Sequence, residues 1–217
     1  MRMPQWAGRY HNGARFYDVL SGERWIYRSG RLRGIEALEL KPGGRVLDIG
    51  CGTGLNMPPV LELIGPNGQF VGVDRSSAML ARARARIARH GWRNVSVIDG
   101  DAAELGGLIP EVEGFDAAIF SYALSIIDEW RESFDQAVAL LRPGGRIAVV
   151  DMALPVGRWR VGWPLARLAC LTGGADPYRW PWTRVLVRTD SVTYEVIKGG
   201  HVHIAAGTRR AAAGPAE

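Results

Sequence analysis

The segment GRVLDIGCGTG, residues 44–54, decides the fold of this chain. Residues 44–50 form a short apolar run bounded by glycines, which is typical of a buried β-strand. Glycines 50, 52 and 54 follow at once, and helical sequence then continues to about Ile64. A strand that passes through a glycine turn into a helix is the first half of a βαβ unit.

The same alternation continues along the chain. A helix that Ser76 or Ser77 would cap runs to His90, and another is expected from about Trp130 to Leu141. The intervening runs are apolar throughout, as expected where helices cover both faces of a parallel sheet. The expected further strands are residues 69–74, 94–99, 115–121 and 146–153. The sequence therefore predicts an α/β, Rossmann-like, doubly wound and mostly parallel sheet.

Both ends of the chain add to this core. Residues 14–40 have a helical period and predict an N-terminal helical cap. SVTYEVI and HVHIAAG flank Lys198-Gly199-Gly200, which predicts an antiparallel hairpin that raises the sheet to seven strands. At 217 residues we expect a single domain. Its expected parts are the cap (1–40), a cofactor-binding core (44–153), a substrate-side insertion (154–189), the hairpin (190–208) and a flexible tail (209–217).

Composition excludes several classes of protein. The chain is 47% hydrophobic and 23% charged, the balance of a folded domain. It lacks a run of eighteen apolar residues, and its two cysteines suggest no disulfide framework, so a cytoplasmic protein is expected. The net charge of +5 is mostly arginine, and the arginine-rich stretch 81–90 fits an amphipathic helix with a solvated basic side. We therefore expect no nucleic-acid partner.

The glycine loop is the first candidate site. Glycines let a ligand approach the backbone, and the start of the next helix offers free N–H groups. A dinucleotide-binding loop would follow the pattern G-x-G-x-x-G/A. Here the third glycine comes early, at Gly54, and Asp48 places a carboxylate in the strand. Both features count against a pyrophosphate ligand, although a tight turn without any ligand stays open.

Two more acidic residues follow their strands in order. Asp74 ends the second strand, where a carboxylate points into the ligand crevice and can accept both hydroxyls of a ribose. Asp101 and Ala102 follow the third strand and could bind the edge of an adenine. Each aspartate alone could equally cap a helix. The ordered combination is much more specific than any of its parts.

With these motifs the chain resembles the class I S-adenosylmethionine-dependent methyltransferases, over about residues 44–151. The resemblance implies that S-adenosyl-L-methionine is the cofactor. Asp48 and the loop 50–54 would hold its methionine portion, Asp74 its ribose, and Asp101 with Ala102 its adenine, on which Arg75 could stack. The cofactor-binding set that this implies is Asp48, Gly50, Cys51, Gly52, Thr53, Gly54, Asp74, Arg75, Asp101, Ala102 and Ser121.

Within this class the chain is similar to bacterial enzymes that methylate lipids and quinones. The similarity rests on Tyr17-Asp18, on residues 121–125 and on residues 128–130. It implies a small or amphiphilic acceptor, such as a lipid amine or a quinone. A methyltransferase for a soluble metabolite and a non-catalytic S-adenosylmethionine-binding protein remain the alternatives. The methylated atom and the oligomeric state stay open.

Methyl transfer needs a base only if the acceptor must lose a proton. The candidates are Tyr10, His11 and Tyr17 in the cap, Tyr122 after the fourth strand and Asp151 in the fifth. Each has an ordinary structural alternative, such as packing for a tyrosine or a surface turn for His11.

Two last features are open to more than one interpretation. His201 and His203 alternate on the last strand and should face one side, but structural roles are favoured over a metal site, and no metal is expected.

Residues 155–182 hold four tryptophans interleaved with arginines. That pattern predicts weak, reversible contact with a membrane surface, or simple closure of the active site.

Overall fold

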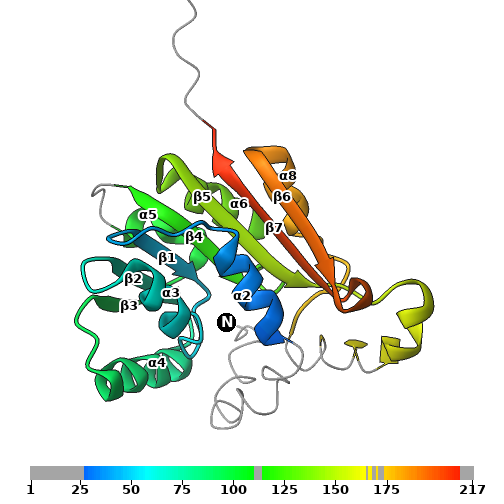
Figure 1. Ribbon diagram of the computed structural model, residues 1–217. Helices are drawn as coiled ribbons and strands as arrows, with labels where there is room; N and C mark the ends of the chain where they lie inside the picture. The colour runs from blue at the N-terminus through cyan, green and yellow to red at the C-terminus, as the bar shows by residue number, and fades with distance from the viewer. Residues whose placement is uncertain (1–26, 110–113, 165, 168–169, 171–173, 211–217) are drawn as a thin grey trace, which may run out of the picture.

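A computed structural model of the chain describes residues 27–109, 114–164, 166–167, 170 and 174–210. Within these ranges strands and helices alternate as expected (Figure 1). The helices are α2 (Arg28–Glu36), α3 (Met57–Ile64), α4 (Ser77–His90), α5 (Leu105–Leu108), α6 (Trp130–Ala139) and α8 (Trp182–Arg188), with 3₁₀ turns η2 (Ala102–Glu104), η3 (Gly157–Gly162) and η4 (Lys198–Gly200). The strands are β1 (Arg45–Ile49), β2 (Gln69–Asp74), β3 (Val95–Asp99), β4 (Phe115–Ser121), β5 (Leu141–Met152), β6 (Thr189–Ile197) and β7 (Val202–Arg209).

The strands form one seven-stranded sheet in the order β3-β2-β1-β4-β5-β7-β6. The pairs from β3 to β5 are parallel, whereas β7 pairs antiparallel with both β5 and β6. The predicted fold class is confirmed, including the C-terminal hairpin. The order reverses next to β1, so the crevice expected for a ligand lies at the carboxyl ends of β1 and β4.

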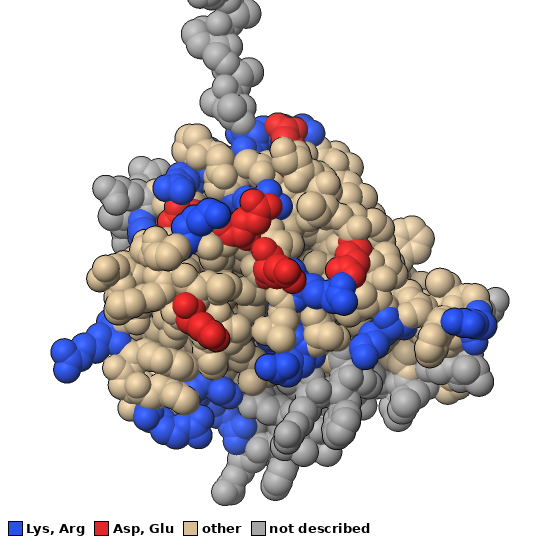
Figure 2. All heavy atoms as spheres, in the orientation of Figure 1, with Lys and Arg blue, Asp and Glu red and all other residues tan. Residues whose placement is uncertain are grey.

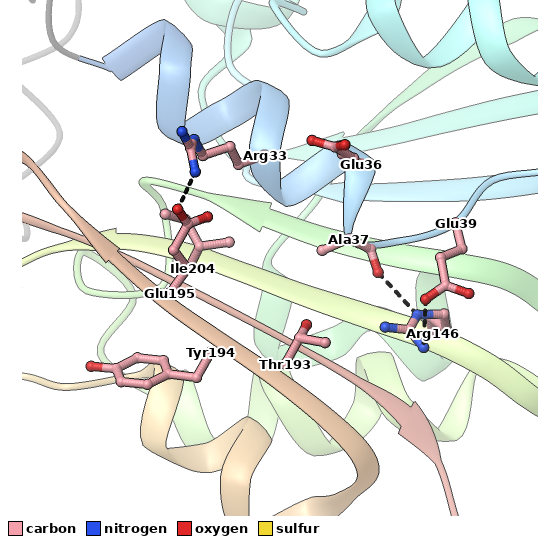
Figure 3. Close-up of a pocket in the computed structure, with 9 residues that line it drawn as sticks. All are labelled: Arg33, Glu36, Ala37, Glu39, Arg146, Thr193, Tyr194, Glu195 and Ile204. Atoms are coloured by element: carbon pink, nitrogen blue, oxygen red, sulfur yellow. Dashed lines mark hydrogen bonds and ion pairs between the residues drawn. The ribbon is translucent and has the colours of Figure 1, made fainter.

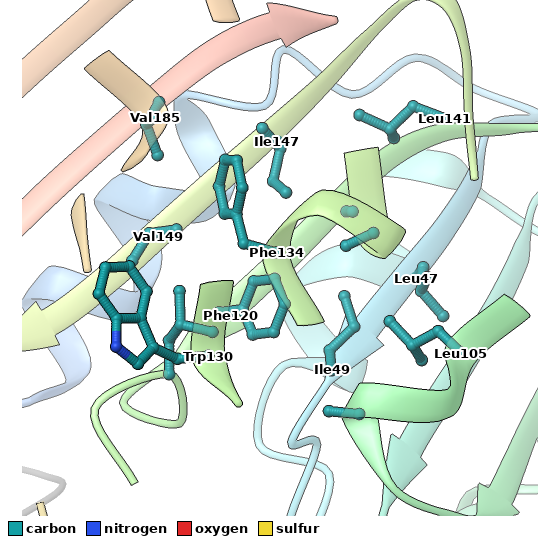
Figure 4. Packing of buried hydrophobic residues seen from close by; sticks show 14 of the residues in the cluster. Leu47, Ile49, Leu105, Phe120, Trp130, Phe134, Leu141, Ile147, Val149 and Val185 are labelled. Atoms are coloured by element: carbon teal, nitrogen blue, oxygen red, sulfur yellow. The ribbon is translucent and has the colours of Figure 1, made fainter. Parts of the chain in front are cut away.

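Helices cover both faces of the sheet. Helices α2, α3 and α4 pack on one face, where Ile35, Val60 and Ala83 meet Val46 and other strand residues. Helices α5, α6 and α8 cover the other face, and side chains from them fill the layer drawn in Figure 4. Alternate residues of β1 enter the two layers, because successive side chains of a strand point to opposite faces. Asp48 therefore shares the face of Val46, beneath α2 and α3.

Local signals set the ends of α4. Ser76 is its N-cap, and its hydroxyl accepts a hydrogen bond from the Met79 backbone N–H at 3.4 Å. Gly91 ends the helix with a left-handed φ of 65°, a conformation that glycine adopts without steric cost. The buried side holds Met79, Leu80 and Ala83, as the predicted amphipathic pattern requires.

Three boundaries differ from the predictions. The helix predicted over 14–40 ends at Glu36, where a turn follows, and residues 14–26 lie outside the described part. Strand β5 starts at Leu141 instead of residue 146, since Leu141 pairs with Phe115 before the register shifts. Strand β7 continues through Arg209, which pairs with Thr189, so this first residue of the predicted flexible tail is ordered.

Within the described ranges no helix is both long and apolar enough to cross a bilayer.

Phe134 on α6 is fully buried in the cluster of Figure 4, so it provides a test of this packing. Phe134→Ala should lower the free energy of unfolding by about 3–5 kcal/mol, because it removes apolar contacts and leaves a cavity. Val187→Ala, at a position 63% exposed on α8, should stay within about 0.5 kcal/mol of wild type. Urea unfolding measures both, and equal losses for the two variants would contradict this core.

Candidate functional site

The parallel strands bring the predicted site residues to one edge of the sheet. Asp48 lies in β1 one residue before its end, Asp74 and Ser121 end β2 and β4, and Asp151 lies in β5. Asp101 follows β3 and precedes η2. Since parallel strands end at the same edge, the ordered sequence motifs become neighbours in space.

The glycine loop owes its shape to left-handed backbone. Gly50, Gly52 and Gly54 have φ values of 70°, 55° and 79°, a region that other residues rarely adopt. A Cβ at Gly50 would lie 2.4 Å from the Ala123 Cβ, whereas a Cβ at Gly52 would meet no atom within 4 Å. Gly50 is therefore required for packing, and Gly52 faces open space that a ligand can enter.

The other two loop residues point into the protein. Cys51 is buried, and a Cβ at Gly72 of β2 would lie 2.8 Å from its Sγ. Burial raises the pKa of the Cys51 thiol well above its usual value. Thr53 is buried as well, and its carbonyl accepts a hydrogen bond from Arg86 Nε at 3.0 Å. These two residues shape the loop through their packing.

Asp48 is the most unusual group at this edge. Its side chain is fully buried, and Oδ1 accepts a hydrogen bond from Asn56 Nδ2 at 2.9 Å. The other oxygen, Oδ2, is buried without a hydrogen-bond partner among the described residues. Burial raises the pKa of Asp48 to about 7, although Asn56 and the Arg31 charge oppose the rise. A buried acceptor without a partner costs stability, so a ligand donor, above all a cationic one, fits this position.

Two residues of this cluster were missed by the sequence analysis. Arg31 of α2 is 9% exposed and donates from Nη1 to Asn56 Oδ1 at 3.0 Å, and Asn56 precedes α3 as its N-cap residue. Asn56 Nδ2 also lies 3.3 Å from Ser121 Oγ. A sequence signal for Arg31 existed: it stands four residues before Ile35, on the apolar side of its helix.

Asp74 connects the glycine loop to α4. Its Oδ2 accepts from the Gly52 N–H and its Oδ1 from the Ser76 N–H, both at 2.8 Å. Burial raises the pKa of Asp74, and these two hydrogen bonds oppose the rise. Asp74 therefore does not cap α4, whose N-cap is Ser76; its carboxylate instead connects that N-cap residue to the glycine loop.

Asp101 also caps its helical turn. Its Oδ1 accepts a hydrogen bond from the Ala103 N–H at 2.9 Å, while Arg75 Nη1 lies 3.9 Å from its Oδ2. Ala102 is buried at the start of η2. The structure therefore brings the predicted adenine-side residues Arg75, Asp101 and Ala102 together.

Of the predicted bases, Tyr122 and Asp151 are described. Tyr122 has a φ of 56° and donates its hydroxyl to the Tyr27 carbonyl at 2.8 Å. Asp151 is fully buried and accepts hydrogen bonds from the Ser125 N–H, the Ser125 hydroxyl and the Met152 N–H. Burial raises the pKa of Asp151 to about 6. Asp151 thereby anchors the loop after β4.

The remaining candidates, Tyr10, His11 and Tyr17, lie outside the described residues.

The two histidines near the hairpin do not face the same side, contrary to the prediction. His201 precedes β7 with helical φ/ψ, which breaks the alternation, and it contacts Tyr27 and the Ala153 carbonyl. His203 lies in β7, stacks on Trp182 at 3.9 Å and bonds Tyr194. No group of three or more potential ligands that could hold a metal occurs in the described ranges.

Trp182 is 5% exposed in this stack. The prediction that it contributes to a membrane-facing surface is therefore wrong.

A cavity of about 260 Å³ opens between α2 and strands β5 to β7 (Figure 3). Arg33 pairs with Glu195 on one side, and Arg146 contacts Glu39 and the Ala37 carbonyl on the other. None of the predicted site residues lines it. A second cavity, of about 470 Å³, is lined by residues 128, 130, 131, 178–180 and 183 near the start of α6. The glycine loop contributes to neither.

The part of the chain that matches a known family includes the glycine loop and the strands that carry the site. The sequence profile of a family described as "Methyltransferase domain" matches residues 40–169, more than half of the chain. The chain belongs to this family. The predicted resemblance to class I methyltransferases and the predicted cofactor, S-adenosyl-L-methionine, are thereby confirmed at the level of the family.

Characterised relatives of this methyltransferase domain differ in acceptor. A 2-phytyl-1,4-naphtoquinone methyltransferase of Synechococcus elongatus is 33% identical over 68% of the chain and 64% of its own length. A ubiquinone/menaquinone biosynthesis C-methyltransferase of Proteus mirabilis is 31% identical over 68% and 59%. An arsenite methyltransferase of Halobacterium salinarum is 33% identical over 52% and 28%. The chain thus matches less than two thirds of the length of each.

Solved structures support the fold. Phosphoethanolamine N-methyltransferase 2 of Haemonchus contortus superimposes with a TM-score of 0.70 at 16% identity, over 91% of this chain and 57% of that one. A SAM-dependent methyltransferase of Aquifex aeolicus gives 0.57 at 17% identity, over 84% and 93%.

The raised pKa of Asp48 makes folding depend on pH. Folding favours its protonated form, so its contribution is largest at low pH and is lost as the pH rises through about 7. Asp48→Asn, which carries no charge, should therefore gain stability relative to wild type between about pH 5 and pH 8, by at least about 1 kcal/mol. Urea unfolding at both pH values measures the difference.

Asp99→Asn, at an exposed position on the neighbouring β3, is the control and should show no such gain. A pH-independent difference between Asp48→Asn and wild type would contradict the burial of an ionisable group at this position.

Proposed function

We propose that the chain is an S-adenosylmethionine-dependent methyltransferase for a small amphiphilic acceptor. The observation that carries the proposal is the buried Asp48 Oδ2, which has no hydrogen-bond partner among the described residues, near the open face of Gly52. A cationic amino group satisfies that oxygen, and the exposed backbone of Gly52 leaves room for the chain that bears it. An amino acid attached to a nucleoside has this shape and charge.

Different residues around the loop would bind different parts of the cofactor. Asp48 would accept from the α-amino group, and Arg31, 3.0 Å from Asn56, would attract the α-carboxylate. Asp74 accepts two backbone hydrogen bonds, but a carboxylate has about four acceptor positions, which leaves capacity for ribose hydroxyls. Arg75, Asp101 and Ala102 would enclose the adenine. The cofactor supplies an activated methyl group when bound.

The protein's own contribution to the reaction is alignment. Correct positioning can remove roughly 7–11 kcal/mol from the barrier of a bimolecular step. Asp151 fixes the segment 122–125 through both its oxygens, and that segment follows β4 at the ligand edge. Because Asp151 is saturated with donors and the Tyr122 proton is donated to a carbonyl, we assign both a positioning role. A proton acceptor in residues 1–26, such as His11 or Tyr17, remains a prediction.

The acceptor class rests on the relatives. Two of them act, by their names, on quinones with long apolar chains, which favours an amphiphilic acceptor. The arsenite enzyme shows that similar domains serve a small inorganic acceptor too, so a soluble metabolite is the second candidate. Transfer of radiolabelled methyl groups to lipid and aqueous extracts separates the two.

Calorimetric titration tests the cofactor assignment. S-adenosylhomocysteine should bind and NAD should bind poorly, because the loop lacks the dinucleotide spacing. Asp74→Ala should weaken binding by about 1.5–3 kcal/mol, the range for hydrogen bonds to a charged group. Asp190→Ala, at an exposed position of β6 where that strand pairs with the end of β7, is the control and should bind like wild type. Unchanged affinity in Asp74→Ala would overturn the ribose assignment, and strong NAD binding would overturn the function.

A further inference from the structure

The chain leaves β5 at the ligand edge and forms an exposed lobe. This lobe, residues 156–159 together with the hairpin turn 198–200, lies beside the carboxyl end of β5; in Figure 1 its first part is in the yellow segment at the right and the turn is the orange-red loop between β6 and β7. Val156 is 64% exposed and Trp159 is 53% exposed. Exposed apolar side chains at one projecting site are unusual for a surface that meets only water.

Val156 and Trp159 pack on the hairpin turn with one side, and each keeps more than half of its surface exposed. The Val156 N–H donates to the Gly199 carbonyl at 3.0 Å, and the Trp159 N–H donates to the Val156 carbonyl at 3.2 Å. A Cβ at Gly199 would lie 2.2 Å from Trp159 Cγ, and a Cβ at Gly200 would lie 2.8 Å from Val156 Cγ2. Both glycines also have positive φ values. Glycine at both positions therefore seats η3 against the hairpin turn.

The charge of this surface is one-sided. Arg158 is exposed with its guanidinium carbon 5.6 Å from the Trp159 ring centre, and Lys198 of the turn is exposed as well. Residues 152–175 contain no Asp or Glu in the sequence. In Figure 2, the charged atoms visible on the right-hand projection are those of Lys or Arg.

We propose that this lobe docks the enzyme onto an anionic lipid bilayer. Tryptophan and valine would enter the headgroup boundary, while Arg158 and Lys198 would meet lipid phosphates. The position suits an amphiphilic acceptor, because β5 connects the lobe to the edge that carries the glycine loop, and in this respect the inference rests on the proposed function. With so few apolar groups the contact is weak and reversible.

Co-sedimentation of the full chain with vesicles tests the docking. Wild type should sediment with vesicles of phosphatidylcholine mixed with phosphatidylglycerol, and much less with phosphatidylcholine alone. Added salt should weaken the interaction, because salt screens exposed charges. Val156→Glu and Arg158→Glu should each reduce binding about tenfold or more, since one places a charge in the boundary and the other reverses a contact.

Matched controls carry the same charge changes elsewhere. Val187→Glu changes a valine that is 63% exposed on α8. This helix leads into β6, whose first residue pairs with Arg209, at the end of β7 that is far from the hairpin turn. Arg89→Glu is at an exposed arginine on α4. Both controls should sediment like wild type. The docking proposal is overturned if wild type stays in the supernatant with both vesicles, or if control and lobe variants lose binding equally.

Titration with S-adenosylhomocysteine keeps this result separate from the proposed function. Lobe variants should bind it with wild-type affinity, because none of their residues contacts the glycine loop. Cofactor binding without vesicle binding overturns the docking alone. Vesicle binding that is lost on lobe substitution, in a chain that binds no cofactor, supports the docking and overturns the methyltransferase assignment.

Discussion

A buried carboxylate needs hydrogen-bond donors from the protein or from a ligand. At Asp48 the described part of the protein supplies a donor to only one of the two oxygens. One oxygen is held by Asn56, which is itself held by Arg31 of α2, and the other has no partner among the described residues. The helix that covers the first face of the sheet is thus connected to the strand that starts the glycine loop. Under the proposed function, the stability given up at this position would be the source of selectivity for a cationic ligand.

The glycine loop depends on the same edge. Gly50 must be glycine because Ala123 lies against it, and Gly52 is held by Asp74 from the neighbouring strand. Three other parts of the sequence therefore fix one short loop: Asp74, the segment after β4, and Asp151 behind that segment. Pre-organisation of this kind is what an alignment-driven reaction requires.

The sequence was sufficient to predict the sheet and the carboxylates but not their partners. Strands β2 and β4 were predicted at their observed bounds, because Pro66-Asn67-Gly68 and Gly114 mark where the two apolar runs begin. Asp74 and Asp101 could be located because one ends a strand and the other follows one, and Asp48 because it lies just before the glycine turn. Periodicity could have placed Arg31 on the buried side of α2, but its contact with Asn56 depends on how α2 crosses the sheet. His201 was misplaced because a helical turn at a single residue reverses the direction of its side chain.

Strand β5 connects the ligand edge of the sheet to the exposed lobe. Asp151 holds the segment that would meet an acceptor, and five residues later Val156 is bonded to the hairpin turn. In the proposed docking mode, the distance from a bilayer surface to the reacting atoms would be set by β5 and by residues 153–156, which follow it. A change in the length of the chain between residues 152 and 156 would thus alter how deep in a membrane an acceptor can be reached. Insertions or deletions in this segment would therefore let related proteins reach acceptors at different depths in a membrane without a change in any cofactor contact.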